Sequence, residues 1–173
     1  WGIVDSADCI ALAHALNAEK LIDPSRIIIS GNSAGGLTAL NALCQADIFQ
    51  AAICKYPVVD LNHMHLKTHR FERNYLNSLI GNFDSNKKKY FERSPKNNIH
   101  KIKSPILLFH GENDSVINSR ESIDFHKKLL EKSVYSEIFL FDNEGHGFKN
   151  IRNKIKVLEK TENFLKYIFS LKH

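Results

Sequence analysis

The sequence predicts an α/β protein built on a parallel sheet of about four strands. Short apolar runs without polar alternation alternate along the chain with segments of ten or more residues whose apolar positions recur at helical spacing. Strands that are buried on both faces have such unbroken apolar runs, and strands that alternate with helices indicate parallel βαβ units. No internal repeat or low-complexity linker divides the 173 residues, so we expect one domain.

The expected elements follow one another in a regular order. Helical spacing of apolar residues extends from Val4 to Glu19, and a turn follows at Asp23-Pro24-Ser25, where proline fixes φ and the aspartate bonds its own backbone. Three β-branched residues, Ile27-Ile28-Ile29, mark the first strand. The expected strands are residues 26–30, 51–56, 105–110 and 136–141, and the later helices are residues 37–46, 119–132 and 154–171.

Residues 60–100 differ in character from the rest of the chain. They are polar, rich in His, Asn and Lys, and lack a clean period apart from a short helical segment at 71–80. We expect a surface excursion between core elements. His63, His65 and His69 resemble a loose metal cluster, but no carboxylate or cysteine stands at a helpful spacing, so a polar surface loop is favoured.

The composition excludes several classes of protein. With 43% hydrophobic and 25% charged residues the chain is typical of globular proteins, and no apolar run approaches the roughly 18 residues of a membrane-spanning helix. The net charge of +5 comes mainly from scattered lysines without interleaved aromatic residues, so nucleic-acid binding is not expected. Cys9, Cys44 and Cys54 stand at apolar positions and are expected to be buried thiols; few cysteines and no signal-peptide pattern favour the cytoplasm.

A G-x-S-x-G motif carries the strongest chemical signal. Residues 31–36 read Gly-Asn-Ser-Ala-Gly-Gly and lie directly between an expected strand and an expected helix. On such a sharp turn the hydroxyl of Ser33 is pushed into the open, and the residues two positions away must lack side chains. The amide of Ala34, at the helix N-terminus, can donate to a developing oxyanion. We expect a nucleophile elbow; a glycine-rich turn or a phosphate loop without its lysine is the alternative.

A serine needs a base and an orienting acid before it becomes nucleophilic at neutral pH. In the α/β-hydrolase fold these follow in the order Ser, Asp or Glu, His, each just past the carboxyl end of a strand. His146, between two glycines after the last strand, is the candidate base, and Asp114 is the candidate acid. Glu112 is a second candidate acid that we expect to point away, and His110 is expected to be buried and hydrogen-bonded.

Several separated stretches of the chain resemble one family. They are Trp1 to Cys9 before the Gly-Asn-Ser-Ala-Gly-Gly elbow, Phe71 to Leu76 with Leu79-Ile80-Gly81 and Arg93-Ser94-Pro95, Pro105 to Gly111 with Asp114 and Val116, and Glu144 to Phe148. In type and order they resemble the catalytic domain of the prolyl oligopeptidase family of serine peptidases, and most closely its acylaminoacyl-peptidase and dipeptidyl-aminopeptidase-like branch. The resemblance covers nearly the whole chain.

The resemblance implies an enzyme that cleaves peptide or acyl-peptide bonds through an acyl-enzyme on Ser33, with no cofactor. It makes Asp114 the acid and His146 the base, which are the residues that the motif order also selects. Within the enzymes, an esterase or dienelactone-hydrolase-like protein is the alternative, because this fold and triad serve many acyl substrates.

The resemblance also implies residues before Trp1. Family members carry an N-terminal β-propeller, further strands of the catalytic domain and a His-Gly-Gly type turn that completes the oxyanion hole. We therefore expect residues 1–173 to be the carboxyl-terminal portion of an α/β-hydrolase domain, with the strand at 26–30 on an open sheet edge that favours self-association. Since loss of an oxyanion donor lowers turnover, an inactive hydrolase-fold fragment is a further alternative.

Overall fold

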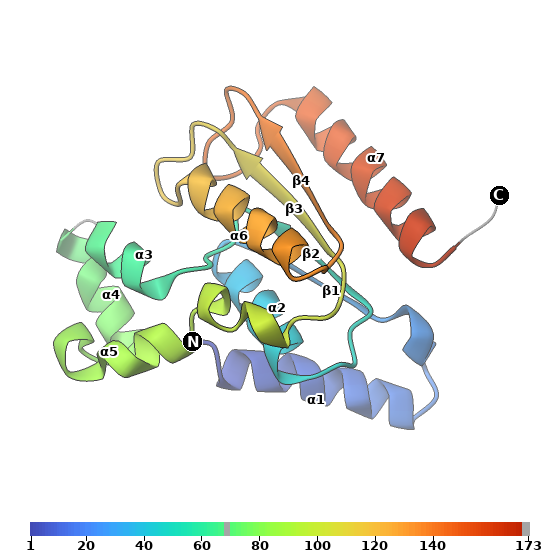
Figure 1. The fold of residues 1–173 in the computed structure, drawn as a ribbon, viewed down its shortest axis with the longest axis horizontal. Helices are drawn as coiled ribbons and strands as arrows, with labels where there is room; N and C mark the ends of the chain where they lie inside the picture. Colours follow the sequence, from blue (N-terminus) through green and yellow to red (C-terminus); the bar gives the residue numbers. More distant parts are fainter. Residues whose placement is uncertain (68–69, 171–173) are drawn as a thin grey trace.

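A parallel sheet of four strands forms the centre of the molecule (Figure 1). The computed structural model describes residues 1–67 and 70–170, with the backbone alone at 70–74. The sheet order is β1-β2-β3-β4, so strands that are consecutive in the chain are neighbours in the sheet. The strands are β1 (Ile28–Asn32), β2 (Ala51–Lys55), β3 (Ile106–Gly111) and β4 (Ser136–Phe141). The predicted α/β class and the parallel sheet are confirmed.

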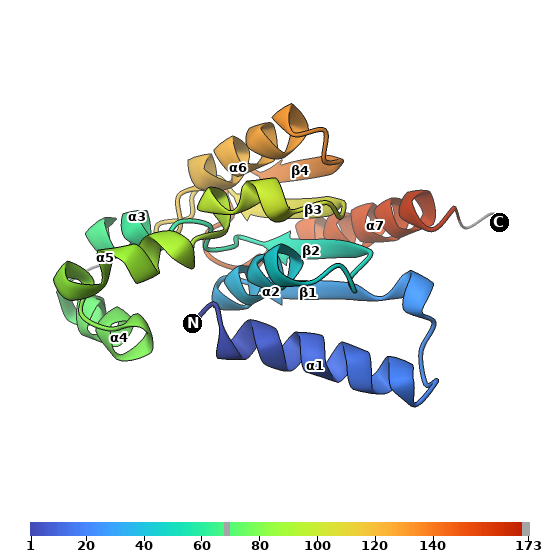
Figure 2. The same cartoon turned by 60° about the horizontal axis from the view of Figure 1, so that its bottom comes forward.

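Helices cover both faces of this sheet. They are α1 (Val4–Ala18), α2 (Ala34–Gln45), α3 (Leu61–Lys67), α4 (Arg70–Ile80), α5 (Phe83–Glu92), α6 (Ser119–Glu131) and α7 (Ile151–Ile168), with short 3₁₀ turns at 24–26, 95–97 and 99–101. Helices α2 and α6 lie on one face and α7 on the other, while α1 packs against α2 beside β1 (Figures 1 and 2). No helix in the described ranges is long and apolar enough to span a membrane.

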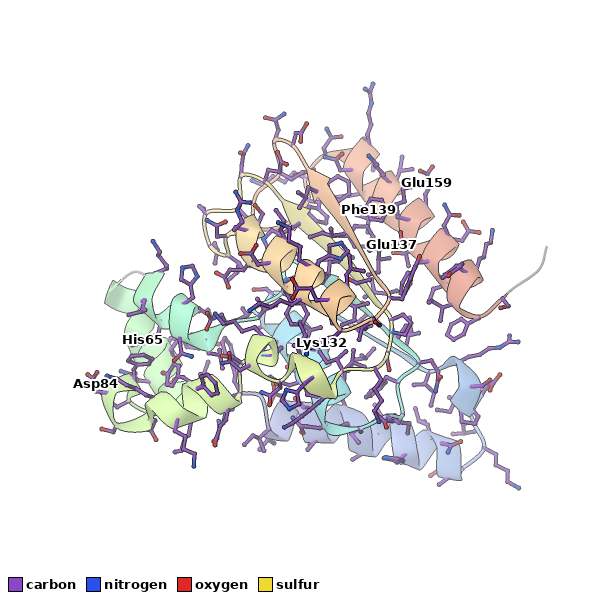
Figure 3. All side chains as sticks on the ribbon, viewed as in Figure 1. His65, Asp84, Lys132, Glu137, Phe139 and Glu159 are labelled. Atoms are coloured by element: carbon purple, nitrogen blue, oxygen red, sulfur yellow. The ribbon has the colours of Figure 1, made fainter. Side chains whose placement is uncertain are left out.

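Two apolar layers hold the helices on the sheet. Ile53 and Leu107 face α7, whereas their neighbours Cys54 and Leu108 face α2 and α6. Because successive strand residues point to opposite faces and both faces are covered, the central strands have unbroken apolar sequences. Phe139 of β4 lies between the sheet and α7 (Figure 3). Complete burial of a side chain such as Leu107 contributes about 1.5–3 kcal/mol, and this burial fixes the strands whose ends carry the site.

Residues 60–100 form an excursion between β2 and β3, and α4 confirms the short helix predicted at 71–80, but the segment holds more helix and more buried surface than predicted. The region contains α3, α4 and α5, which lie together beyond the carboxyl ends of β1 and β2 (Figure 2). Leu61, Leu76 and Tyr90 are fully buried in a second apolar cluster that also contains Leu37 of α2. Helices α3 and α5 are short and supply only a few residues to the shared cluster, so their segments show no clear apolar period.

The histidines of this region connect helices instead of lying in a polar loop. Nδ1 of His63 lies 2.6 Å from Oε1 of Glu121 on α6. The ring of His65 stacks on Phe83 with the centroids 4.0 Å apart, within the group of helices at the left of Figure 3. His69 lies outside the described residues. Within residues 1–67 and 70–170 no three His, Cys, Asp or Glu side chains are arranged to hold a metal ion.

The cysteine prediction is confirmed only in part. Cys54 is buried, and its burial raises the pKa of the thiol to about 12. Cys9 and Cys44 are half-buried instead, although burial also raises the pKa of Cys44 to about 12. All three cysteines are free thiols and none of them forms a disulfide.

Strand β1 lies at the edge of the sheet. Among the described residues it pairs with β2 alone, as the sequence predicts for this strand, although it starts at Ile28 and continues into the G-x-S-x-G motif to Asn32. An apolar groove of about 520 Å³ runs beside it, with Leu12 of α1, Ile29 and Phe49 among the residues that line it. The outer side of β1 therefore combines a strand edge with neighbouring apolar surface.

Candidate active site

Ser33 occupies a strained turn between β1 and α2. Its backbone has φ 52° and ψ −117°, a combination that is rare for a residue with a side chain. The Ser33 N–H donates to the carbonyl of Lys55 at 3.0 Å, and its carbonyl accepts from the N–H of Val58 at 3.2 Å. The segment that follows β2 therefore holds the serine backbone from both sides. This is the geometry expected for a nucleophile elbow.

The glycines of the motif have different roles. A Cβ at Gly31 would lie 2.1 Å from the carbonyl oxygen of Gly35, and one at Gly36 would lie 2.6 Å from Cβ of Pro57. A Cβ at Gly35 would meet no atom within 4 Å. The close approach of strand and helix thus requires Gly31 and Gly36, while the expectation that Gly35 must lack a side chain for lack of space is wrong.

A continuous chain of hydrogen bonds joins the three predicted side chains. Nε2 of His146 lies 2.8 Å from Oγ of Ser33, and Nδ1 lies 2.8 Å from Oδ2 of Asp114. Because a carboxylate only accepts, Nδ1 donates to Asp114, and Nε2 of the neutral ring accepts from the Ser33 hydroxyl. The imidazole is therefore in the tautomer that can take the hydroxyl proton.

Asp114 is fixed by several donors. Its Oδ1 accepts from the N–H groups of Val116 and Ile117, both at 2.9 Å, while Nε2 of His110 lies 3.3 Å from Oδ2. Burial by itself would raise the pKa of Asp114, but hydrogen bonds from His110, Ile117, His146 and Val116 outweigh it and lower the pKa to about 2. Asp114 is thus a permanently ionised partner for His146 near neutral pH.

His110 is buried behind Asp114, as predicted. Nε2 lies 3.0 Å from the carbonyl oxygen of Ile117, and Nδ1 lies 2.8 Å from Oγ of Ser122. A carbonyl oxygen can only accept, so Nε2 carries the proton and Nδ1 accepts from the serine hydroxyl. His110 therefore steadies the loop of Asp114 from the side of α6.

Glu144 holds the histidine loop, a role that was not predicted for it from the sequence. Its buried carboxylate accepts from the N–H groups of Lys149 and Asn150 at 2.8 and 2.9 Å and from Nδ2 of Asn153 at 2.9 Å. Burial would raise the pKa of Glu144, and these hydrogen bonds lower it overall. Its carbonyl also accepts from the N–H of Asn113 at 2.9 Å, so the loops of Asp114 and His146 are joined directly.

The remaining predicted positions are also accounted for. Ala34 is the first residue of α2, where the N–H groups of the first turn have no partner within the helix. Glu112 is exposed, and the carboxylate 2.8 Å from Nδ1 of His146 is that of Asp114. The structure therefore brings together Ser33, Asp114 and His146 and leaves Glu112 outside the hydrogen-bond chain.

The lowered pKa of Asp114 predicts an acid-dependent loss of stability. Its ordinary value of 3.8 lies above the folded value of about 2, so below about pH 4 the unfolded chain binds the proton first. The stabilisation by the ionised carboxylate is complete above this range and is lost as the pH falls toward 2. Urea unfolding from pH 6 to pH 3 is expected to show a smaller loss of stability in Asp114→Asn than in the wild type; equal losses would contradict this.

The fold and the site together define the chain's structural class. A serine on a strained strand-to-helix turn, a carboxylate after β3 and an imidazole after β4 meet at the carboxyl edge of a parallel sheet. This is the α/β-hydrolase fold with the side-chain order that the sequence predicts.

Comparisons with known proteins agree with this class. The chain belongs to the prolyl oligopeptidase family, which it matches over residues 1–172. It is 27% identical over 157 residues to the acylamino-acid-releasing enzyme of Arabidopsis thaliana, covering 84% of this chain and 20% of that protein. It is 29% identical over 146 residues to dipeptidyl aminopeptidase BIII of Pseudoxanthomonas mexicana, covering 81% and 21%.

A solved structure shares both this fold and a higher sequence identity than these two relatives. A puromycin-hydrolyzing peptidase of Mycobacterium tuberculosis superimposes with a TM-score of 0.95 and 36% identity, over 99% of this chain and 26% of that one. The chain spans about a fifth of the length of the curated relatives it matches. The predicted family is confirmed, and the relatives bear the names of the predicted branch.

Proposed function

We propose that the protein is a serine peptidase that cleaves peptide or acyl-peptide bonds with Ser33 as its nucleophile. The observation that carries the proposal is the hydrogen-bond chain from Ser33 through His146 to Asp114, with both distances 2.8 Å. Membership of the prolyl oligopeptidase family supports a peptide substrate. Two relatives are named for the release of acylated amino acids and of dipeptides, which supports the same substrate class.

The proposed reaction has two symmetrical halves. His146 accepts the Ser33 proton as Oγ attacks the substrate carbonyl, and the amide of Ala34 donates to the oxyanion. The C–N bond then breaks, the amine leaves with the proton from the imidazolium, and an acyl-enzyme remains on Ser33. Water repeats the sequence and releases the acid. Asp114 stays ionised throughout and stabilises the imidazolium, and no step of this scheme requires a cofactor.

The substrate class can be tested with paired substrates. The full-length protein is expected to hydrolyse a peptide anilide at a rate typical of enzymes, about 1–10³ per second. Short nitrophenyl esters are expected to react as well, because they form the same acyl-enzyme more easily. Hydrolysis of the esters without any cleavage of anilides bearing free or acylated N-termini would overturn the peptidase proposal and favour the esterase alternative.

We further propose that residues 1–173 all belong to a single α/β-hydrolase catalytic domain and that the protein works in the cytoplasm. The single sheet and the helices packed on both its faces support one domain. Three unpaired cysteines support a reducing compartment, since disulfides form chiefly outside the cytoplasm.

The open edge of β1 predicts self-association of the 173-residue chain. An unpaired strand edge beside an apolar groove is a template for pairing with a second copy. We expect sedimentation velocity at micromolar concentration to show dimers or larger species. Ser30→Lys, which places a charge at an exposed position of β1, is expected to shift the population toward monomer.

A matched substitution controls for the added charge. Asn163 is exposed on α7, away from the strand edge, so Asn163→Lys is expected to leave the association unchanged. A monomeric wild-type chain, or an equal effect of both substitutions, would contradict association through β1.

A further inference from the structure

Tyr56 places an aromatic ring against the imidazole of His146. The two ring centroids are 4.6 Å apart and the ring planes are tilted by 57°. The other neighbour of Tyr56 is Phe148, in an edge-to-face contact at 5.5 Å, and Phe148 in turn contacts Phe141 at 5.0 Å. The imidazole therefore packs against Tyr56, the first of three aromatic rings in contact. The last of them, Phe141 of β4, belongs to the apolar core. Such contacts restrict the orientation of a ring beyond what two hydrogen bonds impose.

The backbone of Tyr56 is held in a strained conformation by the same segment that holds Ser33. Its φ is 38°, a value that a bulky residue rarely adopts. The Tyr56 N–H donates to the carbonyl of Phe109 at 2.7 Å, while Lys55, just before it, and Val58, two residues after it, bond the backbone of Ser33. Strain of this kind persists where the surroundings over-determine it, and it clusters at functional sites.

The electrostatics of the phenol suit a contact with a cation. Burial and the negative charge of Asp114 raise the pKa of Tyr56, so its hydroxyl stays neutral at the pH of catalysis. The face of a neutral aromatic ring attracts cations within about 6 Å of its centroid. His146 becomes a cation whenever it holds the proton of Ser33, so this attraction acts at the step where charge develops.

We propose that Tyr56 is a positioning residue that fixes the imidazole of His146 between Ser33 and Asp114 and favours its protonated form during the reaction. The proposal rests on the proposed peptidase function. Its active group is the aromatic ring, because the ring makes the contacts with His146 and Phe148. The hydroxyl is not required, so phenylalanine should replace tyrosine and an aliphatic residue of similar bulk should not.

The test compares Tyr56→Phe with Tyr56→Leu in the full chain. Leucine keeps apolar bulk and the same backbone strain but removes the ring. We expect Tyr56→Leu to lower kcat about 10-fold, less than the roughly 10²-fold that a 1 Å misplacement can cost because both hydrogen bonds of His146 remain, with KM nearly unchanged. The acid limb of kcat/KM should move toward lower pH by about half a unit. Tyr56→Phe should retain the wild-type kcat and pH profile within about twofold.

Neither Tyr56→Phe nor Tyr56→Leu changes the titratable groups around the imidazole of His146. Asp114 faces Nδ1 and His110 lies behind Asp114, and neither is altered. Tyr167→Leu removes an exposed tyrosine ring from α7 and is expected to leave both the rate and the pH profile unchanged. Circular dichroism with thermal unfolding checks that each variant folds.

The outcomes separate this inference from the proposed function. If the wild type cleaves anilides and Tyr56→Leu keeps its kcat and its acid limb, the positioning role is wrong and the peptidase proposal stands. If Tyr56→Phe is as impaired as Tyr56→Leu, the hydroxyl acts and the ring does not. If the wild type cleaves no anilide, an NMR titration of His146 still tests the ring, and an identical titration midpoint in Tyr56→Leu would overturn it.

Discussion

Replacement of Ser33 by alanine is expected to lower the turnover of a peptide anilide by about 10⁵–10⁶-fold, to the level of the residual catalysis that binding and oxyanion donors supply. The hydroxyl is the only group lost, and no second acceptor of the acyl group replaces it. Steady-state hydrolysis with an assay sensitive to slow turnover measures this loss. A residual rate within about 100-fold of the wild type would show that another group attacks the substrate.

The structure supplies the controls for this substitution. Ser33→Ala keeps a side chain at φ 52°, so the strain of the turn is unchanged and thermal unfolding should remain close to that of the wild type. Ser78 is exposed on α4, and Ser78→Ala is expected to leave turnover unchanged. If Ser33→Ala lost its folded state together with its activity, covalent labelling of the wild-type protein would test the nucleophile instead.

The second large effect is expected for Asp114→Asn, which should lower kcat by about 10⁴-fold with little change in KM. The two backbone N–H groups of Val116 and Ile117 donate to Oδ1, and they would select the amide oxygen of asparagine for that position. The NH₂ group would then face Nδ1 of His146 and force it to accept. Nε2 would carry the proton, and the Ser33 hydroxyl would lose its base.

Glu112→Gln is the matched control for the carboxylate. Glu112 lies two residues before Asp114 on the same loop but is exposed, so its amide variant should keep kcat within about twofold. Stopped-flow or steady-state measurements of kcat for both variants between pH 6 and pH 9 provide the comparison. Near-normal activity of Asp114→Asn together with a large loss in Glu112→Gln would assign the orienting role to Glu112.

The strands and the three meeting side chains could be predicted because their signals are local. Unbroken apolar runs mark strands that are covered on both faces, and each of Ser33, Asp114 and His146 lies in the turn or loop that follows such a strand. Parallel strands bring their carboxyl ends to one edge of the sheet. The order of the residues in the chain was therefore sufficient to predict their convergence.

The rest of the site depends on contacts between distant segments. Glu144 opens a stretch that resembles the family, but its role depends on donors at the start of α7, which its own neighbours in the sequence do not reveal. The positive φ of Tyr56 and its contact with His146 arise from the packing of the β2 end against the β4 loop. Helices α3 and α5 likewise supply few residues to the core that they share with α4, so periodicity revealed only the helix at 71–80.

Activation of Ser33 by His146 is the step on which the proposed peptidase function depends most directly, and covalent labelling tests that step. Mass spectrometry after reaction with a fluorophosphonate should find one adduct per chain, on the peptide that contains Ser33. The phosphorus–oxygen bond forms as fluoride leaves and His146 takes the proton, so His146→Ala should label at least about 100-fold more slowly. Labelling of a different residue, or an equal rate in His146→Ala, would contradict the account.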